Sequence, residues 1–205
     1  MTKLSNGLLG LGAALIVCAL VLAAHNLYRS CAAAEGASYV VTVLQQTRPN
    51  PAEPSAAAVP EPEETPESQP TPAMQMPVVQ VEGQNYIGRL SIPVLELELP
   101  VIEAWDYSAL RLAPCRYAGC VYTDDMVIAA HNYASHFGRL KELSAGDTVS
   151  FMDVEDNVFS YTVEDLELLN PYDISQMTQG DWDLTLFTCT LDSRQRVTIR
   201  CRRAP

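Results

Sequence analysis

Cys189 and His131 are two side chains that could carry out nucleophilic chemistry together. Cys189 ends the alternating stretch "DLTLFTC", and His131 follows the apolar run "DMVIAA", where a buried strand would meet a loop. A thiol nucleophile needs a partner that stabilises the thiolate or moves its proton, and histidine is the usual one. His25 flanks an apolar N-terminal run and His136 lies within the loop that follows His131. The alternative is that Cys189 is only a small buried hydrophobe, as isolated cysteines in strands often are.

An arginine near Cys189 could stabilise the oxyanion that acyl transfer generates. A hairpin turn near residues 191–194 would place the following strand, which starts "RVTIR", beside the strand of Cys189. This arrangement favours Arg196, while Arg194 is a rival that would lie in the turn. The remaining arginines of the last strand are Arg200, Arg202 and Arg203, and they could simply form a solvated face.

The other cysteines indicate neither a zinc site nor a fixed disulfide. The six cysteines include no CxxC pair, and the spacing of the histidines matches no standard zinc pattern. Cys115 and Cys120 flank "RYAG" and could form a small-loop disulfide or remain free thiols. Strand parity places Cys201 on the face that carries Cys189. No metal and no cofactor are therefore predicted.

The charge of the chain argues against nucleic-acid binding. The formal net charge is −12, and residues 83–205 contain 18 acidic and 10 basic side chains. A nucleic-acid binder usually presents a basic face instead. The acidic surplus is typical of a soluble domain that resists self-association.

The N-terminal part of the chain predicts a membrane anchor. After a short flank, residues 1–6, the stretch Gly7–Ala24 contains 18 residues without a charge. As a helix it would reach about 27 Å, close to the hydrocarbon thickness of a bilayer. A cleaved signal peptide is the alternative, but its apolar region is usually about 7–15 residues long. We therefore expect a transmembrane signal anchor over residues 7–28, with the rest of the chain outside the cell.

The remaining chain divides into a linker and a folded domain. Residues 29–82 are expected to form an extracellular stalk, because residues 49–77 contain nine prolines among Ala, Ser, Thr and Glu. Such a composition cannot bury enough apolar surface to fold. Residues 83–205 alternate in short apolar stretches that end at turns, which predicts about seven or eight strands in a small barrel or sandwich. Two short helices are expected at "HFGRLKEL" and "YDISQMT".

Four motifs in this domain resemble those of sortases, the cysteine transpeptidases of Gram-positive cell surfaces. "TLFTC" resembles the family's TLxTC signature, and "IGRLSIPVLELELPV" resembles its opening strands. "VIAAHNYASHFGRL" is similar to the segment of the catalytic histidine, and "RVTIR" to the strand of the catalytic arginine. Two departures are an alanine in place of the usual glycine before the histidine, and a short interval between cysteine and arginine. The histidine segment looks nearer to class B or pilin-polymerising members.

The resemblance implies a fold, a reaction and a set of site residues. The fold is mainly β, a closed eight-stranded barrel with short helices, preceded by the transmembrane helix and the Pro-rich linker. Cys189 corresponds to the nucleophile, His131 to the acid/base, Arg196 to the oxyanion-stabilising group and Thr188 to a substrate-binding residue.

The implied reaction cleaves a Thr–Gly-type bond in an LPxTG-like sorting signal of a secreted protein. The acyl group then passes to an amine of a peptidoglycan precursor or a pilin lysine, with the enzyme in the cell membrane and its catalytic domain extracellular. The alternatives are a hydrolytic cysteine peptidase of the same fold and an inactive, anchored peptide-binding module.

Overall fold

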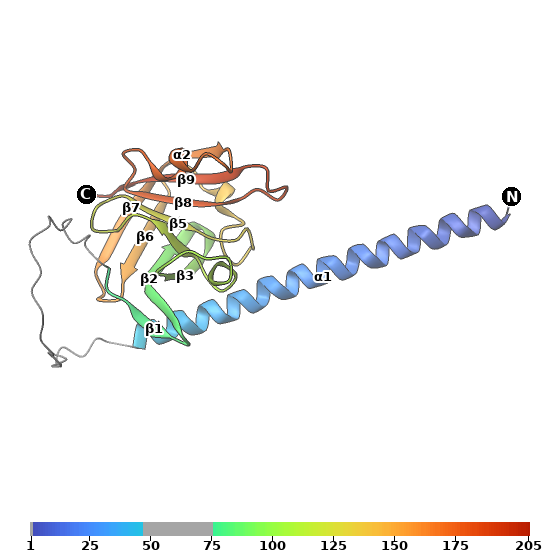
Figure 1. Cartoon of the computed structure of the whole chain (residues 1–205), viewed down its shortest axis with the longest axis horizontal. Helices are drawn as coiled ribbons and strands as arrows, with labels where there is room; N and C mark the ends of the chain where they lie inside the picture. The colour runs from blue at the N-terminus through green and yellow to red at the C-terminus, as the bar shows by residue number, and fades with distance from the viewer. Residues whose placement is uncertain (1, 47–75) are drawn as a thin grey trace, which may run out of the picture.

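A computed structural model describes residues 2–46 and 76–205 of the chain. Within these ranges one long helix precedes a strand-rich domain (Figure 1). The α-helices are α1 (Thr2–Gln46) and α2 (Ile174–Thr178), and the 3-10 helices are η1 (Pro93–Leu95), η2 (Ala109–Arg111) and η3 (Leu140–Glu142). The strands are β1 (Val79–Val81), β2 (Gln84–Ile92), β3 (Leu97–Ile102), β4 (Cys115–Ala118), β5 (Met126–Ala129), β6 (Thr148–Asp153), β7 (Val158–Leu169), β8 (Leu184–Cys189) and β9 (Arg196–Arg203).

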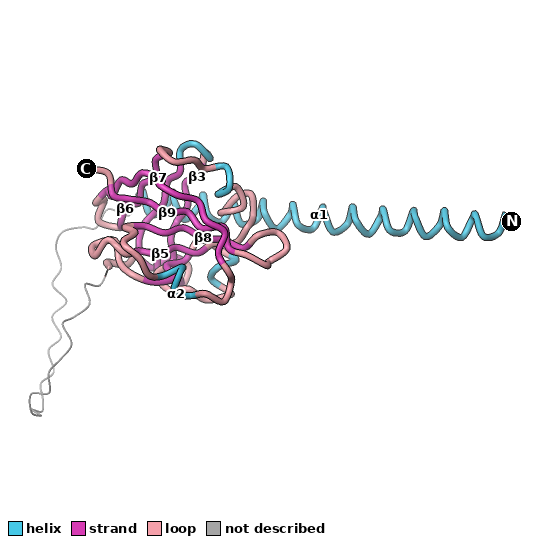
Figure 2. The backbone as a smooth tube through the Cα atoms, turned by 90° about the horizontal axis from the view of Figure 1, so that it is seen from above, coloured by secondary structure: helices cyan, strands magenta, loops and turns pink. Residues whose placement is uncertain are grey.

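The sheet closes into a barrel, as predicted. Its strand order is β1-β2-β3-β4-β5-β8-β9-β7-β6, and a further pairing between β2 and β6 joins the two ends. The eight strands from β2 to β9 therefore form the closed barrel, and β1 is an additional strand on the outer edge of β2. Figure 2 shows these strands wrapped around one core, with α2 on the outside beside β8.

Gly88 allows β2 and β6 to pair, and this pairing is the seam that closes the barrel. It pairs with Asp153 across the β2–β6 seam and has a φ of 153°. A Cβ at this position would lie 2.1 Å from the carbonyl oxygen of Met152. No side chain fits at that distance, so the glycine lets the two backbones approach closely enough to pair.

The barrel core is built from the alternating apolar residues of the strands. Each strand sends every second side chain inward, and β5 and β8 are buried on both faces because other elements cover them outside. Side chains that lie fully inside include Leu90, Ile128, Phe151, Leu186 and Ile199. This core fixes the register of β5, β8 and β9, the three strands that carry the candidate site residues.

Helix α1 continues beyond the predicted anchor and packs against the barrel. It runs without a break to Gln46, and its last turns contact β1 and β3. Ala37 and Val40 are buried there, and Gln45 donates a hydrogen bond to Glu98 over 3.3 Å. The N-terminal part of the helix extends away from the barrel in Figures 1 and 2. Residues 29–46 are thus helical, although the predicted extracellular stalk was expected to start at residue 29.

The predicted transmembrane helix over residues 7–28 lies within α1. Across residues 2–46 and 76–205, no helix combines the length and the apolar character that a membrane span requires. The proline-rich part of the predicted linker falls on residues 47–75, outside the described residues.

Candidate active site

Cys189 and Arg196 face each other across a hairpin. Cys189 is the last residue of β8, Arg196 is the first of β9, and the two are direct partners in the antiparallel register. Residues directly opposite in such a pair point to the same face of the sheet. The connecting turn closes with a hydrogen bond of 3.0 Å from the amide of Thr190 to the carbonyl of Gln195. Cys189 and Arg196 are both half-buried and accessible from solvent.

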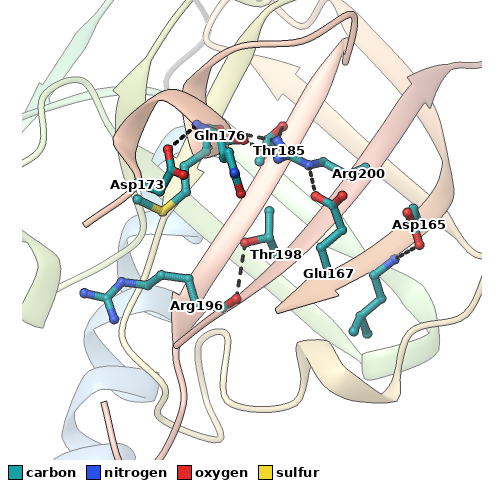
Figure 3. A network of polar contacts seen from close by, with 10 residues as sticks. Asp165, Glu167, Asp173, Gln176, Thr185, Arg196, Thr198 and Arg200 are labelled. Carbon is teal, nitrogen blue, oxygen red and sulfur yellow. Dashed lines mark hydrogen bonds and ion pairs between the residues drawn. The ribbon is translucent and has the colours of Figure 1, made fainter. Parts of the chain in front are cut away.

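Arg194, the rival arginine, lies in this turn. Its side chain is 85% exposed, and its nearest charged partner is Asp192 at 3.8 Å. The register therefore brings Arg196, and not Arg194, opposite Cys189. In Figure 3 the guanidinium of Arg196 points away from the neighbouring polar network of Arg200 and Glu167.

His131 is placed by the parallel pairing of β5 with β8. The register ends with Ala129 opposite Phe187, and Ala130 continues the ladder through its amide, which donates to the carbonyl of Phe187 over 3.2 Å. The hydroxyl of Thr188 donates to the carbonyl of Ala130 over 2.8 Å. Both backbone groups of Ala130 are thus held by β8, which places His131 next to the end of the strand that carries Cys189.

Thr188, predicted to bind substrate, is 3% exposed. It is on the core-facing side of β8, because Cys189 is its neighbour and points to the opposite face. Its observed contact is the hydrogen bond to Ala130, which fixes the backbone directly before His131. This contact gives Thr188 a structural part in the site, through the histidine.

The loop after His131 brings three rings into contact. Tyr133 lies against His131 with ring centroids 4.9 Å apart and planes 28° apart, and its centroid is 5.6 Å from that of His136. A backbone hydrogen bond of 3.1 Å from the amide of Phe137 to the carbonyl of His131 folds the loop tightly. The ring of Tyr133 therefore limits where the imidazole of His131 can lie.

His136 is a buried neutral histidine. Neither ring nitrogen has a hydrogen-bond partner among the described residues. Burial, and secondarily the nearby charge of His131, lowers the pKa of His136 from 6.5 to about 4. His136 is consequently uncharged near neutral pH, which leaves His131 as the histidine that can exchange protons at this site.

Arg200 was expected on a solvated face, and the structure corrects this expectation. Its residue is only 3% exposed. The guanidinium forms an ion pair of 2.8 Å with Glu167 on β7 and a hydrogen bond of 3.1 Å to Thr185 on β8. It also donates to the main-chain carbonyls of Gln176 and Met177 in α2 (Figure 3). The sequence signal for this role is the even spacing from Arg196, which places both arginines on one face of β9.

Arg200 thereby holds α2 on the face of the sheet that carries Cys189. Cys189, Phe187 and Thr185 alternate on that face of β8, and their partners on β9 are Arg196, Thr198 and Arg200. Met177 of α2 packs in one apolar group with Phe187. A ligand bound along this face toward Cys189 would contact the segment around α2 on one side.

The remaining cysteines of the domain, Cys115, Cys120 and Cys201, are buried. Cys115 and Cys120 are both free thiols. Burial raises the pKa of Cys115 and of Cys201 to about 12, so neither is a thiolate at neutral pH. Cys201 pairs with Leu184 and is in the barrel core, on the face opposite Cys189. The predicted face of Cys201 was wrong. The length of the turn between β8 and β9 decides which residues of β9 share a face with Cys189, and Cys201 is not one of them.

Among the described residues, no group of three or more His, Cys, Asp or Glu side chains is arranged to hold a metal ion. The site offers a thiol, an imidazole and a guanidinium, arranged around the adjacent ends of β5, β8 and β9.

Comparisons with known proteins identify the family and the fold of this domain. A family model for the sortase domain matches residues 90–204. Among solved structures, sortase C of Streptococcus pneumoniae is 26% identical, covering 58% of this chain and 69% of that one, with a TM-score of 0.51. Sortase C1 of Streptococcus agalactiae is 20% identical, covering 62% and 71%, with a TM-score of 0.55.

Sortase A of Corynebacterium diphtheriae is 21% identical to the chain, covering 60% of it and 62% of the solved chain, with a TM-score of 0.53. No curated protein matches the chain. The likeness to these solved structures shows a shared fold, and the family model accounts for the barrel from the last three residues of β2 to the end of β9.

Proposed function

Because the chain belongs to the sortase family of cysteine transpeptidases, we propose that it cleaves a Thr–Gly-type bond in an LPxTG-like sorting signal and transfers the acyl group to an amine. The observation that carries the proposal is the direct pairing of Cys189 with Arg196, beside the strand end that positions His131. A thiol, an oxyanion donor and an acid/base are the three groups that this transfer requires.

The first step forms an acyl-enzyme. The thiolate of Cys189 attacks the carbonyl carbon of the threonine, and the guanidinium of Arg196 donates hydrogen bonds to the oxyanion that develops. The C–N bond then breaks, and protonated His131 donates its proton to the departing glycine amine. A thioester on Cys189 and a neutral His131 remain.

The second step releases the product. A primary amine attacks the thioester carbonyl, and neutral His131 takes the proton that the amine loses. A new C–N bond forms and the C–S bond breaks, which returns the thiolate of Cys189 and protonated His131. Arg196 stabilises the oxyanion again, since the carbonyl oxygen carries the same developing charge in both steps.

Thr188 supports both steps from its position before Cys189. Its hydrogen bond to Ala130 keeps the backbone of His131 in register with β8. We assign it an indirect part in substrate binding, through the backbone of His131, because its own side chain is buried on the face opposite Cys189.

The proposed partners follow from the reaction. The acyl donor is a secreted protein with a C-terminal sorting signal, and the acceptor is an amine of a peptidoglycan precursor or a pilin lysine. The enzyme would be in the cell membrane, with its catalytic domain outside. The uncharged run Gly7–Ala24 supports this location. Accessibility of residues 83–205 to added protease on intact cells tests it, and protection from the protease would contradict it.

Two alternatives use the same site differently. A hydrolytic cysteine peptidase would pass the acyl group to water, and an inactive module would bind the sorting peptide without acylation. The accessible position of Cys189 opposite Arg196 favours a working site over an inactive one.

The proposal is tested with the full chain, a panel of LPxTG-like peptides and a set of amines. Transfer predicts an amide product that depends on both the amine and Cys189. A peptide that ends in a free threonine acid, even in excess amine, would identify a hydrolase. Binding of the peptide without any adduct on Cys189 would identify an inactive module.

A further inference from the structure

A cavity of about 370 Å³ lies between α1 and the barrel. Its walls include Tyr39 of α1, Tyr86 of β2, Pro100 of β3 and Tyr133 of the histidine loop. The volume is within the range of small-ligand sites, which are usually lined by apolar and aromatic side chains with a few polar groups. None of the three proposed catalytic residues lines it.

The cavity is adjacent to the acid/base of the proposed reaction. Tyr133 lines the cavity and also stacks on His131, with ring centroids 4.9 Å apart. Helix α1 is held over the same loop, because the hydroxyl of Ser135 donates to the carbonyl of Ser30 over 2.9 Å. The ring of Tyr133 thus lies between the cavity and the imidazole of His131, which must take a proton from the attacking amine.

The lining combines aromatic faces with two opposite charges. Glu82, in the turn between β1 and β2, and Arg111, at the end of η2, both line the cavity. Neither forms an ion pair with another residue in the described ranges. A carboxylate and a guanidinium that line one cavity complement a ligand that carries both an ammonium and a carboxylate, while the tyrosine rings suit the carbon chain between them.

We propose that this cavity binds the acceptor, a peptide segment whose side chain carries the primary amine. The inference rests on the proposed function and identifies where the second substrate lies. With the peptide in the cavity, its amine passes Tyr133 to reach the thioester on Cys189. The C–N bond forms there, the C–S bond breaks, and the amine proton moves to His131. A pilin-type lysine and the diamino acid of a peptidoglycan stem peptide both supply the primary amine, and the diamino acid can also supply the carboxylate.

Gly36 offers a way to fill the cavity without disturbing the fold. It lies on α1 and lines the cavity, and a Cβ placed on it meets no atom within 4 Å. A tryptophan there would extend into the cavity space, and any residue other than proline favours the helix over glycine. Gly12, on the same helix, also has no atom within 4 Å of an added Cβ and does not line the cavity.

The first experiment compares full-length wild type with Gly36→Trp, Gly36→Ala and Gly12→Trp. Each receives an LPxTG-like peptide, with and without a lysine peptide or a diaminopimelate-bearing stem peptide. We expect Gly36→Trp to lower the ratio of transfer to hydrolysis by roughly tenfold, which corresponds to about 1.4 kcal/mol of lost acceptor binding. Hydrolysis without amine should be unchanged in all variants, and both controls should transfer as wild type does. Equal transfer by Gly36→Trp would overturn the inference.

A second experiment tests the site without the reaction. A lysine peptide and a stem peptide, each with a photo-crosslinker, are added to full-length Cys189→Ala. Crosslinks to residues 28–40 or Tyr133 that Gly36→Trp abolishes support the cavity, and the peptide that crosslinks identifies the source of the amine. Crosslinks only elsewhere, or none, overturn the inference. A wild-type chain that forms no adduct on Cys189 would instead contradict the proposed function, whatever the crosslinks show.

Discussion

Cys189 and Arg196 are direct partners at the turn end of the β8–β9 hairpin, so the thiol and the guanidinium point to the same face of the sheet. This relationship depends on the register of the hairpin, which the alternating core residues of β8 and β9 fix. A shift by one residue would turn one of the two side chains into the core. The geometry of the proposed site therefore depends on the packing of the barrel as well as on the length of the turn between the strands.

Replacing Arg196 by Ala should lower kcat by about 10²-fold or more, because the oxyanion loses its charged donor. Arg194→Ala is the matched control, since its side chain is 85% exposed in the turn. Steady-state kinetics on a cleavable sorting peptide measure both variants. A large loss for Arg194→Ala together with a small one for Arg196→Ala would reverse the assignment.

Replacing Thr188 by Val removes the hydroxyl that holds Ala130 and leaves a buried carbonyl without this partner. The cost should be about 1–3 kcal/mol in the free energy of unfolding. We also expect kcat to fall because His131 follows Ala130 directly. Thr188→Ser keeps the hydroxyl and should restore most of both losses. If the serine and valine variants behave alike, the hydrogen bond is not the reason for the threonine.

Replacing Arg200 by Met should loosen α2 from the sheet. The charged hydrogen bonds to Glu167, Thr185 and the α2 carbonyls are lost, at a cost of at least about 2 kcal/mol. Because α2 borders the face of Cys189, we expect KM for the sorting peptide to rise more than kcat falls. Arg202→Met is the control, since its side chain is 38% exposed and exposed ion pairs contribute about 1 kcal/mol or less. Equal effects of the two substitutions would contradict the assignment.

His136 should make the fold less stable in mild acid. Its pKa is lowered from 6.5 to about 4 by burial and by the nearby His131. Between these two pH values the unfolded chain binds a proton that the folded chain does not. The free energy of unfolding therefore falls as the pH drops from 6.5 toward 4, by at most about 3 kcal/mol.

Urea unfolding at a series of pH values measures this effect. His136→Phe should remove this part of the pH dependence, whereas His25→Gln, on the exposed surface of α1, should keep it. A wild-type stability that stays level across the interval would show that His136 is protonated in the folded protein.

Much of the barrel and the site could be predicted from the sequence because the relevant signals are local. Alternation marks the strands, and the order of the motifs at Cys189, His131 and Arg196 indicates the family. The parity of Cys201 and the burial of Arg200 could not be predicted in the same way. The face of Cys201 depends on how many residues the hairpin turn takes up. The burial of Arg200 depends on which element covers the outer face of the sheet. Both are properties of the tertiary structure.

The sequence also did not predict how far α1 extends along the chain. The residues after the apolar run include "AAAEGASYVV", whose small side chains fit a helix but do not show what it packs against. In the structure this segment contacts β1 and β3, so residues 29–46 belong with the catalytic domain. The cavity under α1 follows from that contact, and no motif in the sequence marks it.

The central claim is that Cys189 forms a thioester with the sorting signal, and mass spectrometry of the full chain tests it most directly. After incubation with an LPxTG-like peptide, we expect an acyl adduct on Cys189 that hydroxylamine releases and that Cys189→Ala lacks. The buried Cys115 and Cys201, with pKa values of about 12, should remain unmodified in the same sample. A peptide product that forms equally well with Cys189→Ala, or an adduct on another cysteine, would contradict the account.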